Sequence, residues 1–308
     1  MKIFKIIEKN FGFLLIVSAI LAFYFPHWFL WGENLIDEFL MFALFLGCLK
    51  INFSEIFHIR ENFLKILFFA FLNTIIFPVV FYYLSFFLDQ EIRLGFFLLF
   101  GVSSGVLTPI LAGFFDLKIL WSIVFVVLSS IIVPFSVPFL LELLFKTSVE
   151  ISTIEMVLFL TKIIFIPAIL AIVFKKIFSK IIKLIFLFSG GLGGLSIVIC
   201  LGIIIAVNQD FLFENLFHFS TIPIVIGLCF LVLFKFMFGF YLPFVDQKER
   251  WTNSLMFGIM NNGLIILLAT EFLTEKVLFV VLLSEIPYVL CQSIFQKILQ
   301  KFYKNKNV

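Results

Sequence analysis

Long apolar runs constrain this chain more than any other feature. Most of the sequence consists of apolar segments of about twenty residues, the length of a helix that crosses the hydrocarbon core of a bilayer. Hydrophobic residues make up 63% of the 308 residues and charged residues only 13%. Soluble domains, by contrast, are about a quarter charged. The sequence therefore predicts an all-α polytopic membrane protein, with the lipid bilayer as a partner and no nucleic acid.

The distribution of apolar and basic residues predicts ten spans. They cover residues 11–31, 35–50, 64–88, 93–113, 119–145, 154–174, 181–207, 219–243, 252–271 and 277–297. If both termini are cytoplasmic, 17 of the 22 Lys and Arg residues fall on the inside, 3 on the outside and 2 within spans. This asymmetry follows the positive-inside rule. It predicts an even number of spans in the cell (inner) membrane, with both termini in the cytoplasm.

Two segments of the chain resemble each other at an offset of 157 residues. They read GVSSGVLTPILAGFF at 101–115 and GIMNNGLIILLATEF at 258–272, and each is the fourth span of a five-span half. An odd number of spans per half places the two halves in opposite orientations, which is the inverted-repeat architecture of secondary transporters. We therefore predict one five-helix repeat over residues 1–153 and a second over residues 154–308.

Both repeated segments contain residues that interrupt helices and small polar residues between them. The helix-breaking residues are Gly105, Pro109, Gly258 and Gly263, and the polar residues are Ser103, Ser104, Thr108, Asn261 and Asn262. Interrupted helices of secondary transporters bind substrate or ions near the middle of the membrane. Alternatively, the two asparagines hold neighbouring helices together. An unpaired amide in hydrocarbon costs roughly 2–7 kcal/mol, so in either case these amides face protein, water or ligand.

The same segments resemble the bile acid:sodium symporter family, within the larger bile/arsenite/riboflavin transporter superfamily. RWTNSLMFGIMNNGLIILLA (250–269) is similar to the signature of that family's ninth helix. Three further segments resemble its second, third, and fourth to fifth helices: LIDEFLMFALFLGCLKINF (35–53), FLNTIIFP (71–78) and SSGVLTPILAGFFDLKILWSIVFVVLSSIIVPFSVP (103–138). The similarity runs in order over nearly the whole chain.

The resemblance implies ten helices in two inverted five-helix repeats. Helices 3–5 and 8–10 would form a core domain, in which helices 4 and 9 cross as broken helices, and helices 1, 2, 6 and 7 would form a panel domain. The resemblance also implies transport by alternating access, driven by sodium. The substrate would be an organic anion such as a bile acid, a sulfated steroid or a small carboxylate.

Several residues depart from the sodium-binding pattern of the family. Met256 stands where the family has the acid that binds sodium, and Met260 stands where it has a glutamine. Three further positions lack the family's polar residues: Gly105, Val106 and Val126. The polar residues that persist are Asn73, Ser122 and Asn261. Sodium prefers several oxygen ligands, and thioethers are soft ligands. These replacements predict the family's fold without its ordinary sodium coupling.

Charged residues within the predicted spans are a further set of candidates. Glu285 lies near the middle of the last span, and Gln292 follows on the same helix face seven residues later. A carboxylate within the membrane is a functional candidate, and it can carry a proton in place of sodium. Alternatively, Glu285 forms a static pair with Lys235 or with a hydroxyl group. Lys162 and Lys235 are either functional charges or side chains that extend to a membrane interface.

We therefore predict a secondary active transporter of a small organic anion, with Na+ or H+ as the coupling ion and no other cofactor. Two alternatives remain. One is a permease similar to the auxin efflux carriers, proton-coupled or working as a uniporter; the other is a non-transporting sensor or degenerate homologue. The sequence has no phosphate loop, no catalytic-triad spacing and no CxxC pair, and it predicts no enzyme. It does not define an oligomeric state.

Overall fold

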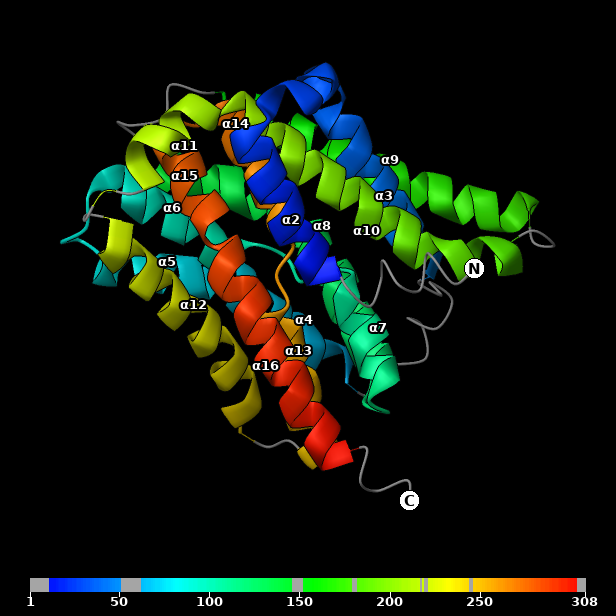
Figure 1. Ribbon diagram of the computed structural model, residues 1–308. Coiled ribbons are helices and arrows are strands. Elements are labelled where there is room, and N and C mark those ends of the chain that lie inside the picture. The colour runs from blue at the N-terminus through cyan, green and yellow to red at the C-terminus, as the bar shows by residue number, and fades with distance from the viewer. Residues whose placement is uncertain are drawn as a thin grey trace. The chain divides into compact units, whose positions relative to one another are not determined.

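A computed structural model shows a helical protein (Figure 1). The structure describes residues 11–50, 62–145, 152–178, 182–216, 218, 221–243 and 246–303. Within these ranges the ordered elements are helices, and the one β-type contact is an isolated bridge. The predicted orientation rests partly on basic residues outside these ranges, namely Lys2, Lys5, Lys9, Arg60, Lys146, Lys180, Lys304 and Lys306.

The chain divides into two compact units, each of which joins segments that are distant in sequence. The first unit comprises Met1–Asn52 and Leu158–Thr221, and the second comprises Phe53–Val157 and Ile222–Val308. Each unit therefore draws on both halves of the chain. The proposed repeats, residues 1–153 and 154–308, follow the order of the sequence rather than this division, and they stay a prediction.

The first unit is built around a glycine-containing helix. Its elements are α2 (Phe11–Tyr24), the 3-10 turns η1 (Pro26–Trp28) and η2 (Leu30–Leu35), α3 (Ile36–Lys50), most of α9 (Thr153–Ile177), α10 (Ile182–Val207) and α11 (Gln209–Leu216). Helix α10 packs along α2 and α3. A Cβ atom at Gly202 would lie 2.6 Å from the Ser18 hydroxyl oxygen, so this glycine lets α2 approach α10 closely. The Ser196 hydroxyl donates to the Phe39 carbonyl at 2.7 Å, an interhelical bond typical of membrane helices.

The second unit contains the remaining helices. They are α4 (Phe63–Phe71), the π-helical turn η4 (Leu72–Ile76), α5 (Phe77–Leu84), α6 (Gln90–Gly101), α7 (Leu107–Phe114), α8 (Ile119–Leu144), most of α12 (Thr221–Tyr241), α13 (Gln247–Gly258), α14 (Asn262–Phe272), α15 (Glu275–Leu283) and α16 (Glu285–Tyr303). Aromatic rings fill its interior. The ring of Phe77 lies 4.6 Å from that of Phe238 and 5.7 Å from that of Phe257, measured between centroids. Part of the phenylalanine content is therefore core packing.

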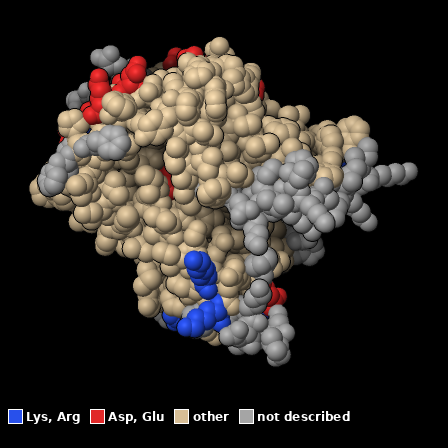
Figure 2. All heavy atoms as spheres, viewed as in Figure 1, with Lys and Arg blue, Asp and Glu red and all other residues tan. Residues whose placement is uncertain are grey.

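Six helices of the described residues are long and apolar enough to cross a membrane. They are Phe63–Leu84, Ile119–Leu144, Thr153–Ile177, Phe188–Val207, Thr221–Tyr241 and Glu275–Lys301. The other four predicted spans fall on shorter helices: α2, α3, the pair α6 and α7, and the pair α13 and α14. The total of ten spans stays a prediction. Uncharged residues dominate the described surface of the face shown in Figure 2, as expected for contact with lipid.

Two helical segments of the second unit are interrupted in the middle. Five residues separate the end of α6 at Gly101 from the start of α7, and three residues separate the end of α13 at Gly258 from the start of α14. The connection between α13 and α14 is the thin orange segment of Figure 1. A Cβ atom at Gly258 would clash with the ring of Phe236, so this helix end requires a glycine. The residues between the helix halves have extended or irregular backbone.

The two unwound segments pair with each other, and we call this contact the crossing. Ser104 and Met260 form an antiparallel bridge. Two backbone hydrogen bonds flank it, from Gly105 N–H to the Ile259 carbonyl at 2.8 Å and from Asn261 N–H to the Ser103 carbonyl at 3.0 Å. An unpaired backbone group in a membrane costs several kcal/mol. Each unwound segment supplies some of the partners that the other loses by leaving the helix.

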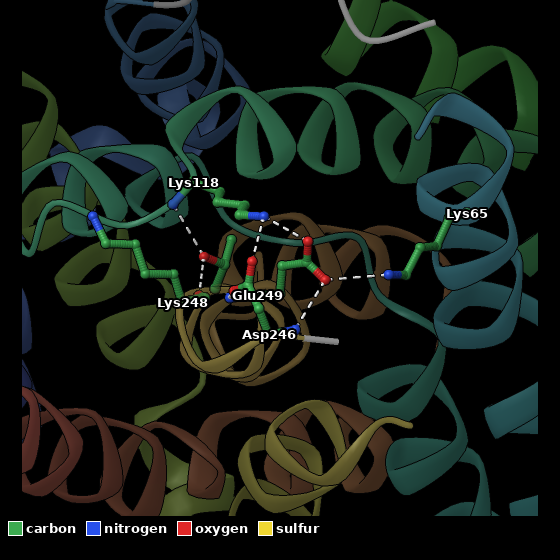
Figure 3. A network of polar contacts seen from close by, with 6 residues as sticks. Lys65, Lys118, Asp246, Lys248 and Glu249 are labelled. Atoms are coloured by element: carbon green, nitrogen blue, oxygen red, sulfur yellow. Dashed lines mark hydrogen bonds and ion pairs between the residues drawn. The ribbon is translucent and has the colours of Figure 1, made fainter. Parts of the chain in front are cut away.

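A network of charged side chains ties the start of α13 to neighbouring segments (Figure 3). Asp246 caps α13 in a capping box with Glu249. Lys118, just before α8, places its Nζ 2.9 Å from Asp246 Oδ2 and also pairs with Glu249. Lys65 of α4 lies 3.2 Å from Glu249 Oε2. The Lys118 backbone N–H donates to Thr252 Oγ1 at 3.1 Å, so three segments meet at this end of α13.

We expect Lys118→Met to lower the free energy of unfolding by less than about 2 kcal/mol, because two partly exposed ion pairs are lost. Burial alone would raise the pKa of Asp246, but bonds from Lys118 and from the backbone of Glu249 hold it below its ordinary value of 3.8. This contribution to stability is therefore present above that pH and is lost as the pH falls toward the lowered pKa. The difference between Lys118→Met and wild type, measured by thermal unfolding in detergent, should shrink in acid. Lys297→Met, on the exposed face of α16, is the control.

The crossing leads to a second prediction, at Gly105. A Cβ atom there would lie 2.9 Å from the carbonyl oxygen of Met260, which is backbone and cannot rotate away. We expect Gly105→Ala to lower the free energy of unfolding by about 1–3 kcal/mol, the usual cost of overpacking. Gly113→Ala is the control, because its Cβ would lie 3.4 Å from the tip of the Ile119 side chain. Equal thermal stability of the two variants would contradict the close approach.

Candidate functional site

Helix ends of both polarities meet at the crossing. Helices α6 and α13 end there, and α7 and α14 begin there. The last four carbonyl groups and the first four N–H groups of a helix have no partner within the helix. Helix N-termini favour anions, and helix C-termini favour cations. The backbone at the crossing therefore offers donors to an anion and acceptors to a cation within one region of the second unit.

The hydroxyl groups of Ser104 and Thr108 stabilise the crossing. Ser104 Oγ donates to the Ile259 carbonyl at 3.2 Å and lies 2.8 Å from Thr108 Oγ1. Because a serine hydroxyl has one proton, Thr108 is then the donor to Ser104. The Ser104 N–H donates to Ser129 Oγ of α8 at 3.2 Å. Both predicted residues, Ser104 and Thr108, are buried and are used to join the two unwound segments.

Asn73 reaches the crossing from a π-helical turn. Such turns insert an extra residue into a helix and are frequent at functional sites. The Asn73 Nδ2 donates to the Val102 carbonyl at 2.9 Å, which satisfies another group freed by the end of α6. Its Oδ1 is buried without a hydrogen-bond partner. Asn73 therefore presents one spare acceptor next to the unwound segment 102–106.

Three buried side chains near the crossing have unused hydrogen-bonding groups. They are Ser103, whose hydroxyl has no partner, and Asn253 and Asn262, whose amides have none on either atom. Asn262 is only 4% exposed and is the first residue of α14. Its amide lies beside the carboxyl group of Glu285 without meeting hydrogen-bond geometry. Buried polar groups are normally satisfied, so unsatisfied ones suggest a bound partner.

Four further predicted residues belong to α7, to α14 with its N-cap position, and to α16. Asn261 caps α14, and its backbone N–H is used in the crossing. Pro109 and Gly263 lie in the first turns of α7 and α14, the two half-helices that begin at the crossing. Glu285 is the first residue of α16, directly after the interruption at Ser284.

Gln292 and Ser122 take no part in the hydrogen bonds that form the crossing. Gln292 is partly exposed, two turns further along α16. The Ser122 hydroxyl donates to the Ile119 carbonyl of its own helix at 2.6 Å.

Three residues at the crossing were not among the predicted site residues. Ser129, two turns after Ser122 on α8, is the α8 serine that contacts Ser104. The Tyr288 hydroxyl donates to the Met260 carbonyl at 3.2 Å. The Lys235 side chain is fully buried and does not extend to a membrane interface. Its ammonium group donates hydrogen bonds to carbonyls at the end of α6. Two features of the sequence could have indicated these residues. Ser129 follows Ser122 by seven residues, which places both on one face of a helix, and Lys235 is a charged residue within a predicted span. Lys162, in contrast, is half exposed and lies 3.7 Å from Asp37.

Several groups at the crossing are poor ligands for a sodium ion or already accept hydrogen bonds. The side chains of Met256 and Met260 are buried thioethers. The Met260 carbonyl is already bonded by Tyr288, and the Ser104 hydroxyl by its neighbours. Among the described residues, no three His, Cys, Asp or Glu side chains cluster as metal ligands.

These features define a helical membrane protein of the transporter class, and comparison with protein families identifies the family. The Sodium Bile acid symporter family matches residues 38–215, more than half of the chain. The chain belongs to this family, whose members are membrane transporters rather than enzymes, and it is an integral membrane protein. Comparison with curated proteins gives no match. The matched range includes α6 and α7 and ends before α13.

The hydrogen bond from Tyr288 provides a test of the site geometry. We expect Tyr288→Phe to lower the free energy of unfolding by about 1–3 kcal/mol, because the buried Met260 carbonyl loses its donor while the ring is retained. Tyr241→Phe is the matched control, since Tyr241 is 64% exposed. Thermal unfolding in detergent measures both variants. Equal midpoints would show that Tyr288 does not support the crossing.

Proposed function

We propose that the protein is a secondary active transporter that carries a small organic anion across the membrane by alternating access. The observation that carries this proposal is the buried, unsatisfied amide of Asn262 at the start of α14. It lies where two half-helices begin, so free backbone N–H groups and a side-chain amide are available in one place. Membership of a transporter family supports the same conclusion.

The chemistry of the site favours an anion with oxygen acceptors. N–H groups at the starts of α7 and α14 carry partial positive charge and bind carboxylate, sulfate or phosphate groups. The Ser103 hydroxyl, which has no hydrogen-bond partner, and the Asn262 amide, which lies beside the Glu285 carboxyl, add donors from side chains. A bile acid-like or other small carboxylate satisfies these donors. The apolar rings around the crossing suit the rest of such a molecule.

The coupling ion of this proposal is a proton, with Glu285 as its carrier. The Glu285 carboxyl lies beside Asn262, so an anion at the start of α14 would lie close to it. An anion next to an ionised carboxylate is repelled strongly in a region of low dielectric. A protonated carboxyl removes this repulsion and can donate a hydrogen bond. The anion and a proton are therefore expected to bind together, without sodium.

The first test is thermal stability of the purified protein in detergent, with a panel of organic anions. We expect at least one anion to raise the unfolding midpoint more at acidic than at neutral pH, and equally in sodium and in choline salts. A ligand at a hundred times its Kd stabilises the folded state by about 2.7 kcal/mol. A sodium-dependent shift would contradict the proton coupling. Absence of both binding and transport across the panel would favour a non-transporting homologue.

The second test is uptake of the same anion by proteoliposomes with an imposed pH gradient. We expect Glu285→Gln to abolish the dependence of uptake on the gradient, because the amide cannot release a proton. Glu271→Gln, at an exposed position near the end of α14, is the matched control. Full gradient-driven transport by Glu285→Gln at all pH values would contradict the proposal that Glu285 carries the proton. Uptake that is independent of any gradient in the wild type would instead indicate a uniporter.

A further inference from the structure

Lys235 of α12 is a buried charge that the proposed transport of an anion does not use. Its side chain has no exposed surface, although Leu233 and Met237, two residues away on either side, are exposed. Placing an ammonium group in a protein interior costs several kcal/mol unless its surroundings compensate the charge. The surroundings of Lys235 must therefore compensate its charge.

The compensation comes from the end of α6. The Lys235 Nζ donates to the carbonyl oxygens of Leu99 and Phe100, at 3.2 Å each. In a continuous helix these carbonyls would accept from the N–H groups of Ser103 and Ser104. The helix stops at Gly101, and the Ser104 N–H turns instead to Ser129. The ammonium therefore occupies two acceptors that exist because the helix is broken.

No carboxylate shares this charge among the ion pairs of the described residues. The negative end of the α6 dipole and the two carbonyls are its counter-charge. The next residue, Phe236, contacts the other broken helix: its carbonyl accepts from Ser254 Oγ at 2.7 Å, and its ring packs on Gly258. Helix α12 thus touches the ends of both α6 and α13, and the ammonium lies at the end of α6 that leads into the crossing.

Secondary transporters hold their coupling cation with unwound carbonyls and with the C-terminal ends of half-helices. We propose that the Lys235 ammonium is a covalently attached cation that occupies such a position at the end of α6. The crossing is then electrostatically complete without a bound metal ion. The inference that transport needs no metal ion rests on the proposed transport function. The inference that the Lys235 ammonium occupies the end of α6 does not.

The test removes the attached cation and offers a free one. Lys235→Ala deletes the atoms of n-propylammonium and leaves the two carbonyls without a donor. We expect its unfolding midpoint in choline chloride to be below that of wild type, and n-propylammonium to raise it by roughly 2–4 °C. Sodium should raise it by a smaller amount. The wild-type midpoint should be the same in all three salts, and so should that of the exposed control Lys297→Ala.

Neutral n-propanol separates charge from volume. If it raises the midpoint of Lys235→Ala as much as n-propylammonium does, or if no cation raises it, the proposal is overturned. Lys235→Met serves if the alanine variant does not fold, because it keeps the volume and removes the charge. A lower midpoint for Lys235→Met than for Lys235→Arg supports the proposal, and a midpoint equal to wild type overturns it. These measurements use no substrate, so a failure of the transport proposal would leave their outcome unchanged.

Discussion

The structure of the second unit depends on the pairing of two unwound segments inside a membrane protein. Leaving the helix frees backbone groups that lipid cannot satisfy. Segments 102–106 and 259–261 satisfy part of this requirement for each other through the bridge between Ser104 and Met260. Asn73, Tyr288 and Lys235 satisfy further carbonyls from three other helices. A few donors remain after this pairing, such as the Asn262 amide, and our proposal assigns them to a ligand.

The residues that stabilise the crossing also occupy backbone carbonyls that could otherwise bind a cation. These carbonyls accept instead from a tyrosine hydroxyl, an asparagine amide and a lysine ammonium. Met256 and Met260, where the resemblance to the family implies polar residues, are buried thioethers. In our proposal the Lys235 ammonium occupies the end of α6, and Glu285 carries the proton that is bound and released during transport. The tethered ammonium and this proton together replace a bound sodium ion.

The helix breaks and most polar residues of the crossing were predictable from sequence, because glycine, proline and adjacent small polar residues are local signals. Gly105 and Gly258 lie at or next to the breaks, and Ser104 and Asn261 form the crossing itself. The choice between Ser122 and Ser129 was not predictable, since both lie on one helix and the depth of α8 is set by tertiary packing. The same holds for Lys235, whose burial depends on where α12 meets α6. The unsatisfied state of Asn262 is likewise a property of its neighbours and not of its own segment.

The most direct test of the central claim is an experimental density map of the protein with a stabilising organic anion bound. The account predicts that the anionic group lies against the first N–H groups of α7 and α14, within hydrogen-bond distance of the Asn262 amide. It also predicts the Lys235 ammonium on the carbonyls of Leu99 and Phe100 and no metal density at the crossing. An anion bound away from these helix starts, or a sodium ion between the broken helices, would contradict it.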